Sequence, residues 1–444
     1  DIMQRWLVAW LVVLGLSGAV ANGQTREEKV RNDKQKIEAE GFWIYNDLKT
    51  AFARGKQTGK PILVVLRCLP CEECVKLDDD LIDQDEILRP LLEQFICARQ
   101  VATNGLDLSL FQFDTDQSWA MFLFNADGTI YGRFGTRSHR TEWNGDVSLP
   151  GMAEALIGAL ELHSNYPANK AALAGKRGQP VEFAAPEKFP SLAGKFTDSL
   201  DYSGNVVKSC IHCHQIGDAQ RDLYISRGQP IPEEVLFPYP HPKSIGLILD
   251  SEARAKVLQV EENSWAARAG FLAGDSINQM AGQPLVSIAD VQWVLHNVPA
   301  SGGQVVVDVT RNRQPVQLTL ELPAGWRRAG DLSWRSSSWG LRRIATGGLL
   351  LKPLDEPSRR ERKLGDQQMA LRVDHVGQYD AHAAGKNAGF QQHDILVQVD
   401  GRRDLMTEAA VFYHLTSTRK AGEKVDVTVI RGDQKIELQL PIQY

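Results

Sequence analysis

The sequence has few cysteines and no strong excess of charge of either sign. Six cysteines in 444 residues are too few to build a disulfide scaffold in place of a hydrophobic core. The formal net charge of −5 excludes the basic surface that is typical of nucleic-acid-binding proteins. With 43% hydrophobic and 24% charged residues, the chain has the composition of folded globular domains. Its length predicts two to four of them.

The sequence also lacks a hydrophobic run that is long enough to span a bilayer. The apolar segment Trp6–Leu16 is much shorter than the roughly 20 residues of a membrane-spanning helix. It follows Arg5 and precedes Ala19-Val20-Ala21, which is the pattern of a secretory signal peptide. We therefore expect residues 1–21 to be a cleaved signal peptide and the protein to be periplasmic or secreted. The alternative is an uncleaved membrane anchor.

Residues 41–165 alternate between helix-like and strand-like patterns. Ile62–Leu66 is a continuous apolar run, as expected for a buried parallel strand. Gly59–Leu66, followed by cysteines at a strand-to-helix junction, resembles the thioredoxin-like family and implies an α/β domain over 41–165. The preceding residues, 22–40, are predicted to form a polar arm, and residues 166–194 are predicted to form a linker.

Three cysteines follow this strand. The resemblance implies that Cys71 is the attacking thiol and Cys74 the resolving thiol of a C-x-x-C motif, because a helix N-terminus lowers a cysteine pKa. Cys68 offers a competing pair with Cys71. The pattern leaves a redox-active dithiol, a structural or sensing disulfide and a metal site as alternatives. Where the family carries a cis-proline facing the disulfide, this chain has Trp119, which argues against ordinary thiol exchange.

A second cysteine cluster has the sequence Cys210-Ile211-His212-Cys213-His214. C-x-x-C-H is the attachment signature of c-type haem. Cys210 and Cys213 would form thioethers and His214 would ligate iron, and we expect all three on one helical turn. His241 is the candidate distal ligand. The alternatives are a disulfide and a zinc site that uses His212 or His214.

An internal repeat organises the rest of the chain. Ala269-Gly270-Phe271 followed by Asp275 recurs as Ala388-Gly389-Phe390 followed by Asp394. Two copies are too few for a solenoid and predict tandem globular domains. The repeats resemble PDZ domains of the kind attached to trypsin-like periplasmic proteases. This implies two α+β, partly open barrels, at 244–325 and 339–444, with residues 326–338 as a linker.

The PDZ resemblance also implies a binding mode, in which a peptide adds as a strand to a sheet edge. A loop presents its backbone N–H groups to the terminal carboxylate, and a helix completes an apolar pocket. The implied residues are Ile245, Gly246, Leu247, Ile248, Val291 and Leu295 in the first copy, and Trp339, Gly340, Leu341 and Val411 in the second. The alternative is that these domains only pack against their neighbours. No motif of a serine protease is visible.

The patterns together predict a multidomain protein: a thioredoxin-like domain, a short α-rich cytochrome c-like segment at 195–243 and two PDZ domains. The favoured function is a periplasmic redox or electron-transfer protein that carries covalent haem c and docks protein C-termini or extended peptides, among them a redox partner. One alternative is a non-enzymatic PDZ adaptor with a degenerate thioredoxin-like domain. The other is a thiol-disulfide oxidoreductase of exported proteins. We expect no nucleic-acid partner, and no membrane contact beyond the signal peptide.

Overall fold

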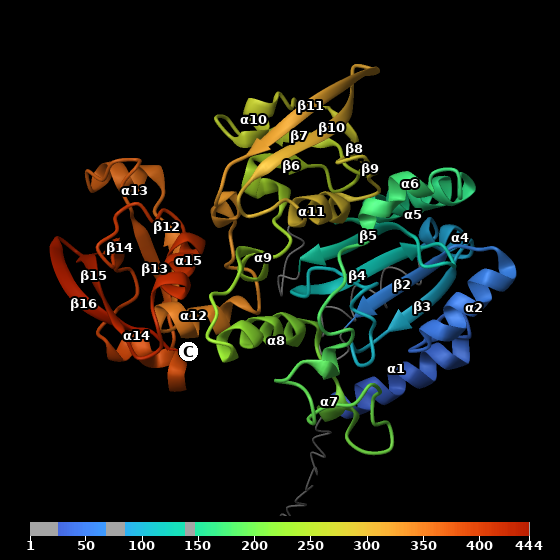
Figure 1. Ribbon diagram of the computed structural model, residues 1–444, viewed down its shortest axis with the longest axis horizontal. Coiled ribbons are helices and arrows are strands. Elements are labelled where there is room, and N and C mark those ends of the chain that lie inside the picture. The colour runs from blue at the N-terminus through green and yellow to red at the C-terminus, as the bar shows by residue number, and fades with distance from the viewer. Residues whose placement is uncertain (1–24, 68–84, 138–146, 444) are drawn as a thin grey trace, which may run out of the picture.

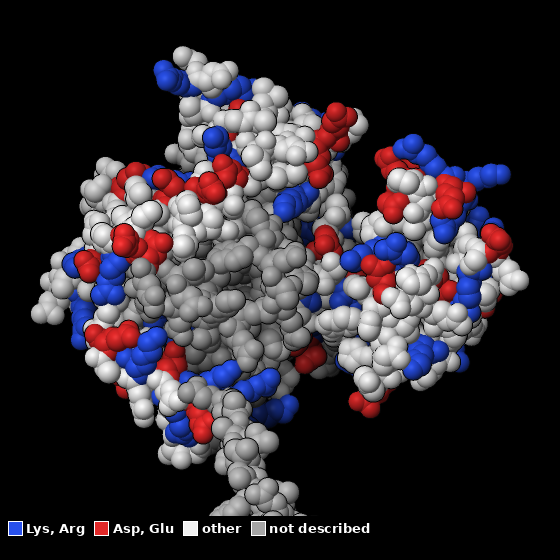
Figure 2. Space-filling view, turned by 180° about the vertical axis from the view of Figure 1, so that it is seen from behind, with Lys and Arg blue, Asp and Glu red and all other residues white. Residues whose placement is uncertain are grey.

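The computed structural model describes residues 25–67, 85–137 and 147–443. The predicted signal peptide and Cys68, Cys71 and Cys74 lie outside the described residues. Figure 1 shows an N-terminal domain built on one sheet and two β-rich bodies, one for each copy of the repeat. Within the described ranges, no helix is long and apolar enough to cross a membrane. Figure 2 shows Lys and Arg interspersed with Asp and Glu on one face.

The N-terminal domain is a five-stranded sheet in the order β1-β3-β2-β4-β5. β1, β3 and β2 run parallel, whereas β4 and β5 are antiparallel. Every residue of β2 is buried, as the continuous apolar run predicted. The strands are β1 (Ile44–Tyr45), β2 (Ile62–Arg67), β3 (Ile96–Gln100), β4 (Gln117–Phe124) and β5 (Ile130–Arg137). The helices are α2 (Leu48–Thr58), α4 (Leu88–Leu92) and α5 (Leu149–Ser164).

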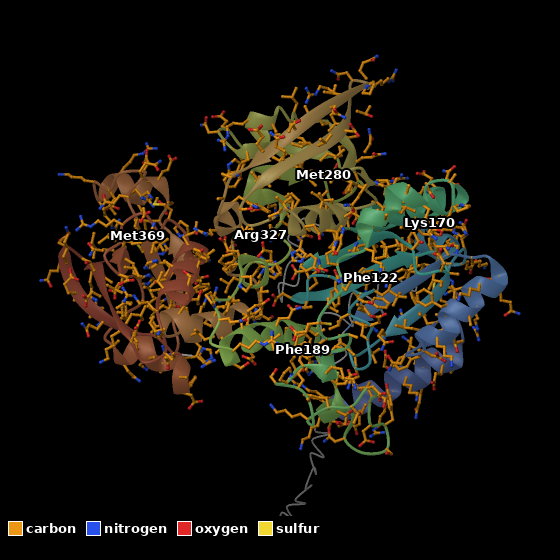
Figure 3. The ribbon with its side chains drawn as sticks, in the orientation of Figure 1. Phe122, Lys170, Phe189, Met280, Arg327 and Met369 are labelled. Atoms are coloured by element: carbon orange, nitrogen blue, oxygen red, sulfur yellow. The ribbon has the colours of Figure 1, made fainter. Side chains whose placement is uncertain are left out.

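Segments outside the predicted boundaries complete this domain. Phe122 of β4 lies in a core that also contains Phe189 and Ile211, and Figure 3 shows Phe189 between the sheet and α8 (Cys213–Ser226). Residues 166–194 are thus more than the linker that was predicted, because Leu173, Phe189 and Leu192 of this segment are buried. The segment contains α6 (Lys170–Leu173), η2 (Ala174–Lys176) and η3 (Pro186–Lys188).

The predicted polar arm is a packed helix, α1 (Arg26–Glu40). Thr25 and Glu28 form a capping box at its N-terminus, which satisfies N–H groups that have no partner within the helix. The carboxylate of Glu27 accepts hydrogen bonds from the backbone N–H groups of Val206 and Val207. These residues open α7 (Val206–Ser209), so α1 ties the segment before the C-x-x-C-H motif to the N-terminal domain.

The first repeat forms a β6-β7 hairpin and a sheet in the order β11-β10-β8-β9. Its N-terminal approach contains α9 (Glu233–Leu236) and η4 (Pro242–Ile245). The strands are β6 (Leu247–Leu249), β7 (Val257–Val260), β8 (Ser276–Met280), β9 (Gln283–Pro284), β10 (Gly303–Arg311) and β11 (Gln314–Leu322). The helices are α10 (Trp265–Ala269) and α11 (Ile288–His296).

The second repeat follows η5 (Trp326–Ala329) and has one sheet in the order β12-β13-β14-β15-β16. Neither this sheet nor those of the first repeat closes into a barrel over the described residues. The strands are β12 (Leu349–Pro353), β13 (Leu371–Val376), β14 (Ile395–Val399), β15 (Lys424–Arg431) and β16 (Gln434–Pro441). The helices are α12 (Ser338–Thr346), α13 (Glu356–Glu361), η6 (Asp380–Ala383), α14 (Ala384–Asn387) and α15 (Glu408–Thr418).

The repeated aspartate has the same structural role in both copies. Asp275 forms two hydrogen bonds with the guanidinium of Arg311, and Asp394 forms the same pair of bonds with Arg431. The arginines also donate to the carbonyl oxygens of Gly270 and Gly389. The sequence repeat is therefore a repeat of tertiary contacts as well as of residues.

A buried charge cluster fastens the first repeat to the N-terminal domain. Asp290 of α11 accepts from Nζ of Lys176 at 2.8 Å and from the backbone N–H of Arg133 in β5 at 3.1 Å. Lys176 and Asp290 are both nearly fully buried. The guanidinium of Arg133 lies 3.8 Å from the ring centroid of Trp293. One face of α11 is thus committed to an interface within the chain.

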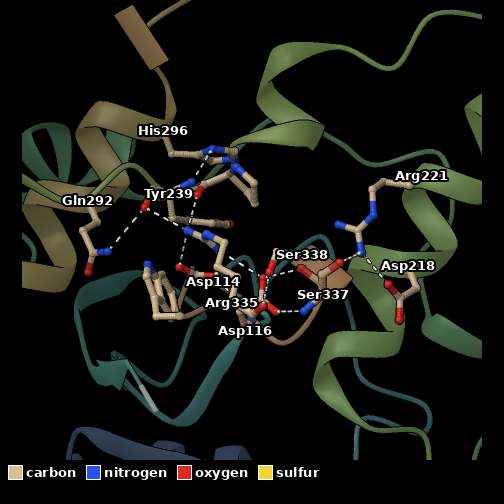
Figure 4. Close-up of polar contacts among 12 residues, drawn as sticks. Asp114, Asp116, Asp218, Arg221, Tyr239, Gln292, His296, Arg335, Ser337 and Ser338 are labelled. Carbon is tan, nitrogen blue, oxygen red and sulfur yellow. Dashed lines mark hydrogen bonds and ion pairs between the residues drawn. The ribbon is translucent and has the colours of Figure 1, made fainter. Parts of the chain in front are cut away.

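A second buried network extends this contact toward α12. Arg335 forms hydrogen bonds with the carboxylates of Asp114 and Asp116, and Ser337 donates from its backbone N–H to Asp116 at 2.9 Å. Figure 4 shows these residues beside Tyr239. The predicted linker 326–338 is therefore anchored in the N-terminal domain.

Candidate functional site

The predicted carboxylate-binding loop of the first repeat lies between η4 and β6. Gly246 has a φ of 80° and ends η4, a backbone conformation that favours glycine. A Cβ atom at this position would lie 2.1 Å from Cβ of Ser264. Both the positive φ and the close approach of Ser264 therefore require glycine at position 246, which is the residue that the predicted carboxylate-binding loop has there.

The edge of β6 opposite β7 pairs with no strand in the described part of the chain. The carbonyl of Gly246 accepts from Glu261, and the N–H of Asp250 donates to Lys256. Backbone N–H and C=O groups point to alternate edges along a strand. Those of Leu247 and Leu249 therefore point away from β7. The hydrogen bonds found among the described residues include none at these N–H groups.

The side chains predicted to line the first pocket come together but are closed off from solvent. Leu247, Val291 and Leu295 belong to one core and are each 0% exposed. Ile248 is half-buried. Because Leu247 and Leu249 are 0% and 4% exposed as whole residues, a peptide could reach both the backbone edge and the pocket only after the neighbouring side chains rearrange.

The predicted loop of the second repeat is wrong. Trp339, Gly340 and Leu341 lie inside the helix α12, whose buried face packs on the second core. The corresponding loop is Gly347-Gly348, with φ values of 60° and 87°, directly before β12. Trp339-Gly340-Leu341 matches the apolar-Gly-apolar pattern of the carboxylate-binding loop although it is helical. The pattern alone does not distinguish a helix from a loop.

Residues of α12 and α15 close the edge of β12. Oε1 of Glu408, the first residue of α15, accepts from the backbone N–H of Leu351 at 2.9 Å. Both carboxylate oxygens of Glu408 also bind the guanidinium of Arg342 in α12, at 2.9 and 2.8 Å. Val411 is fully buried in the second core. This repeat therefore bonds with its own side chain the strand edge that, in the described residues of the first repeat, has no partner strand.

The C-x-x-C-H motif does not form a single helical turn, contrary to the prediction. Cys210 and His212 have extended ψ values of 128° and 149°, and α8 begins only at Cys213. The cause is the anchoring of Ile211. Its N–H donates to Asn104 at 2.8 Å and its carbonyl accepts from Thr103, while its side chain is 0% exposed.

Neither thiol of the motif is part of a disulfide within the described residues, and the two lie in different environments. Cys210 is buried and Cys213 is half-buried. Burial raises the pKa of the Cys210 thiol to about 12, so this thiol is protonated at neutral pH. Modification of Cys210 requires the anchored segment to open first.

The histidines of the motif are more accessible. His214 is about half exposed, with Nδ1 3.6 Å from Oδ2 of Asp218. Its ring stacks on that of His212, with centroids 5.9 Å apart. Burial, and then the neighbouring His214, lower the pKa of His212. The zinc alternative finds no third ligand, since no group of three His, Cys, Asp or Glu suited to a metal occurs in the described part of the chain.

These residues fit covalent haem in part. His214 and Cys213 are adjacent at an accessible helix start, and Asp218 is placed to orient the imidazole in the way that carboxylates orient metal-ligating histidines. His241 is buried, caps η4 and accepts at Nδ1 from the N–H of Lys243. No described contact joins it to His214, so its role as a distal ligand stays a prediction.

Trp119 lies where the sequence placed it. It pairs in register with Arg67, the last residue of β2 before the cysteine segment. The indole is 1% exposed and packs edge-on against Phe134. The predicted dithiol lies outside the described residues, so the position of Trp119 opposite it stays a prediction.

Sequence reasoning missed the buried charges that organise the site, above all Asp290, Lys176 and Glu408. One signal was available, since Asp290 interrupts an otherwise apolar helix and buried carboxylates are nearly always paired. Nothing in the sequence indicated that Lys176, within the segment predicted to be a linker, is its partner.

Comparison with known proteins defines two parts of the chain. A model of the thioredoxin-like family matches residues 43–126, and a model of the PDZ domain matches residues 244–322. The chain therefore is a multidomain α/β protein that contains a thioredoxin-like domain and a PDZ domain.

Individual relatives are distant. The periplasmic pH-dependent serine endoprotease DegQ of Escherichia coli (strain K12) is 25% identical over 190 residues, which are 43% of this chain and 37% of DegQ. The match thus spans little more than a third of DegQ. A solved structure of the HtrA-type protease AlgW with a decapeptide has 14% sequence identity and a TM-score of 0.22, covering 42% of this chain and 54% of that one.

Proposed function

We propose that this protein is an exported docking protein that binds protein C-termini or extended peptides through its PDZ domain, with the thioredoxin-like domain as a fixed base. The single observation that carries the proposal is the unoccupied edge of β6 next to the Gly246 loop. The periplasmic location of DegQ and the signal-peptide pattern support export. The second repeat is proposed to be a PDZ fold whose edge is closed by Glu408.

The interface between the PDZ domain and the thioredoxin-like domain supports a fixed arrangement of the two domains. The Asp290–Lys176 pair and Trp293, which donates to the carbonyl of Gly175 at 2.9 Å, hold α11 against η2. A peptide on β6 would be presented at a constant orientation to the thioredoxin-like domain. Trp119 at the cis-proline position favours a role for this domain as a scaffold rather than as an oxidoreductase.

The test is binding of a pool of fluorescent decapeptides with free apolar C-termini, measured by anisotropy on the full chain. Amidation of the peptide C-termini should weaken binding at least tenfold. Gly246→Ala should do the same, because the added Cβ meets Ser264. Gly282→Ala is the matched control, since Gly282 also has positive φ but an added Cβ meets nothing within 4 Å. Equal binding of free and amidated peptides would overturn the proposal.

A second candidate is electron transfer through haem c, which the accessible His214 beside Cys213 favours. Cys210 and Cys213 would hold the haem, and His214 would ligate its iron. Bound haem would supply one-electron transfer. A haem stain on a denaturing gel, from cells that mature c-type cytochromes, tests this, with Cys210→Ser/Cys213→Ser as control. A colourless wild-type band rejects it.

The third possibility, thiol-disulfide exchange by Cys71 and Cys74, rests on the sequence alone. Insulin-reduction activity that Cys71→Ser abolishes would favour an oxidoreductase over the docking protein proposed first.

A further inference from the structure

A large cavity lies at the junction of the thioredoxin-like domain, α8 and the PDZ domain. Its volume is about 650 Å³, which is within the range of roughly 300–1,000 Å³ that small-molecule sites occupy. None of the residues assigned above to peptide or haem binding lines it. The cavity is therefore separate from both proposed functions.

One wall of the cavity is apolar and rich in aromatic rings. It includes Phe111, Phe113, Phe183 and Phe189, together with Ile216 and Leu223 of α8. Phe111 and Phe113 also pack edge-on against Phe122, so their rings are fixed. A rigid aromatic wall favours flat apolar ligands.

His296, at the end of α11, adds a polar imidazole to the lining of the cavity. Nδ1 of His296 accepts from the backbone N–H of Tyr239 at 3.3 Å, and the two rings stack with centroids 4.0 Å apart. Burial, and then the neighbouring arginines, lower the pKa of His296 to about 3. The imidazole is therefore neutral at physiological pH and carries its proton on Nε2, which makes this atom a donor.

The charged residues of the lining disfavour anions. Asp116, Glu182 and Glu234 line the cavity against a single basic residue, Arg221. Arg221 already bonds to the carboxylate of Asp218 and to the carbonyl of Ser337. Asp116 is paired with Arg335 and Glu182 with Arg227, so a ligand with a negative charge would meet carboxylates that are already neutralised and, among the described residues of the lining, no unpaired cation.

We propose that this cavity binds a neutral, flat aromatic molecule that carries a hydrogen-bond acceptor, with Nε2 of His296 as the donor to that acceptor. The aromatic wall supplies the affinity, and His296 and a lining whose charges are already paired supply the selectivity. Cys213 precedes Gly217, a lining residue, by one turn of α8. The ligand would consequently lie along the helix that begins with the C-x-x-C-H motif.

The experiment measures fluorescence of Nile red, a neutral flat dye with a carbonyl acceptor, on addition of the full chain. We expect one saturable site. Gln220→Trp should weaken binding at least tenfold, because Gln220 lines the cavity and the larger side chain fills it. The control is Asp222→Trp, on the exposed side of the same helix. Nile red binding that Gln220→Trp leaves unchanged would overturn the proposal.

Two further measurements test the selectivity. His296→Phe removes the donor but keeps a ring on Tyr239, and should weaken Nile red binding by about three- to tenfold, as loss of one hydrogen bond does. The anionic dye ANS should bind the cavity more weakly than Nile red. Binding of ANS that is as tight as that of Nile red, and equally lost in Gln220→Trp, would contradict the selectivity for a neutral ligand.

Discussion

Oε1 of Glu408 accepts a hydrogen bond at 2.9 Å from the backbone N–H of Leu351, across the edge of β12. The same carboxylate is paired with Arg342, and both side chains are almost fully buried. In the PDZ domain the first residue of the corresponding helix is Ile288, which has no acceptor to offer. A side chain of the same repeat thus bonds the edge of β12, whereas no such bond occurs at the edge of β6 in the described residues.

Loss of the Glu408 carboxylate is expected to destabilise the second repeat strongly. Glu408→Ala leaves Arg342 buried without a counterion and Leu351 without an acceptor, and breaking a buried pair in this way costs about 3–5 kcal/mol. Urea denaturation measures the change. Asp404→Ala is the control, because its partner Arg402 is about half exposed and such pairs contribute about 1 kcal/mol or less. Similar losses for the two variants would contradict the buried pair as the source of stability.

Periodicity predicted the elements that bury a continuous apolar face, and it failed where polar contacts decide the conformation. The run Ile62–Leu66 became the central strand β2, and the repeated Asp275 and Asp394 marked equivalent folds. The segment 210–212 is extended because Asn104, about a hundred residues earlier, holds Ile211. Spacing alone carries no information about such a distant partner.

The interface between the thioredoxin-like domain and the PDZ domain is expected to depend more on Asp290 than on Lys176. Asp290→Ala removes the acceptor of Lys176 and of two backbone N–H groups, those of Arg133 and Val286. Lys176→Met removes one bond of the buried Asp290 carboxylate, which keeps its two backbone donors and the nearby guanidinium of Arg133. Asp290→Ala should cost about 3–5 kcal/mol and separate the unfolding of the two domains into two transitions in denaturant. An equal or larger effect of Lys176→Met would show that the backbone bonds contribute little.

Cys210 is expected to react with thiol reagents much more slowly than Cys213. Its thiol is buried and its pKa is raised to about 12, and only the thiolate reacts. Asn104→Ala should speed the reaction of Cys210 at least tenfold, because Asn104 bonds to Ile211, Ser209 and Thr197. Labelling with iodoacetamide followed by peptide mass spectrometry assigns each site. Equal labelling rates of Cys210 in the wild type and the variant would contradict the anchoring role of Asn104.

Acid is expected to destabilise the PDZ domain through His296. Its pKa is lowered to about 3 in the folded protein, against about 6.5 in an unfolded chain. Between these values the unfolded state binds one more proton, so stability falls as the pH decreases. Lowering the pH from 7 to 5 should cost about 1–2 kcal/mol through this residue. Urea denaturation of the wild type and of His296→Phe at both pH values isolates the contribution. The groups that face His296 are Arg327, Arg335, Arg133 and Tyr239, and none of them titrates between pH 5 and 7. The same pH dependence in both proteins would place the acid sensitivity at another residue.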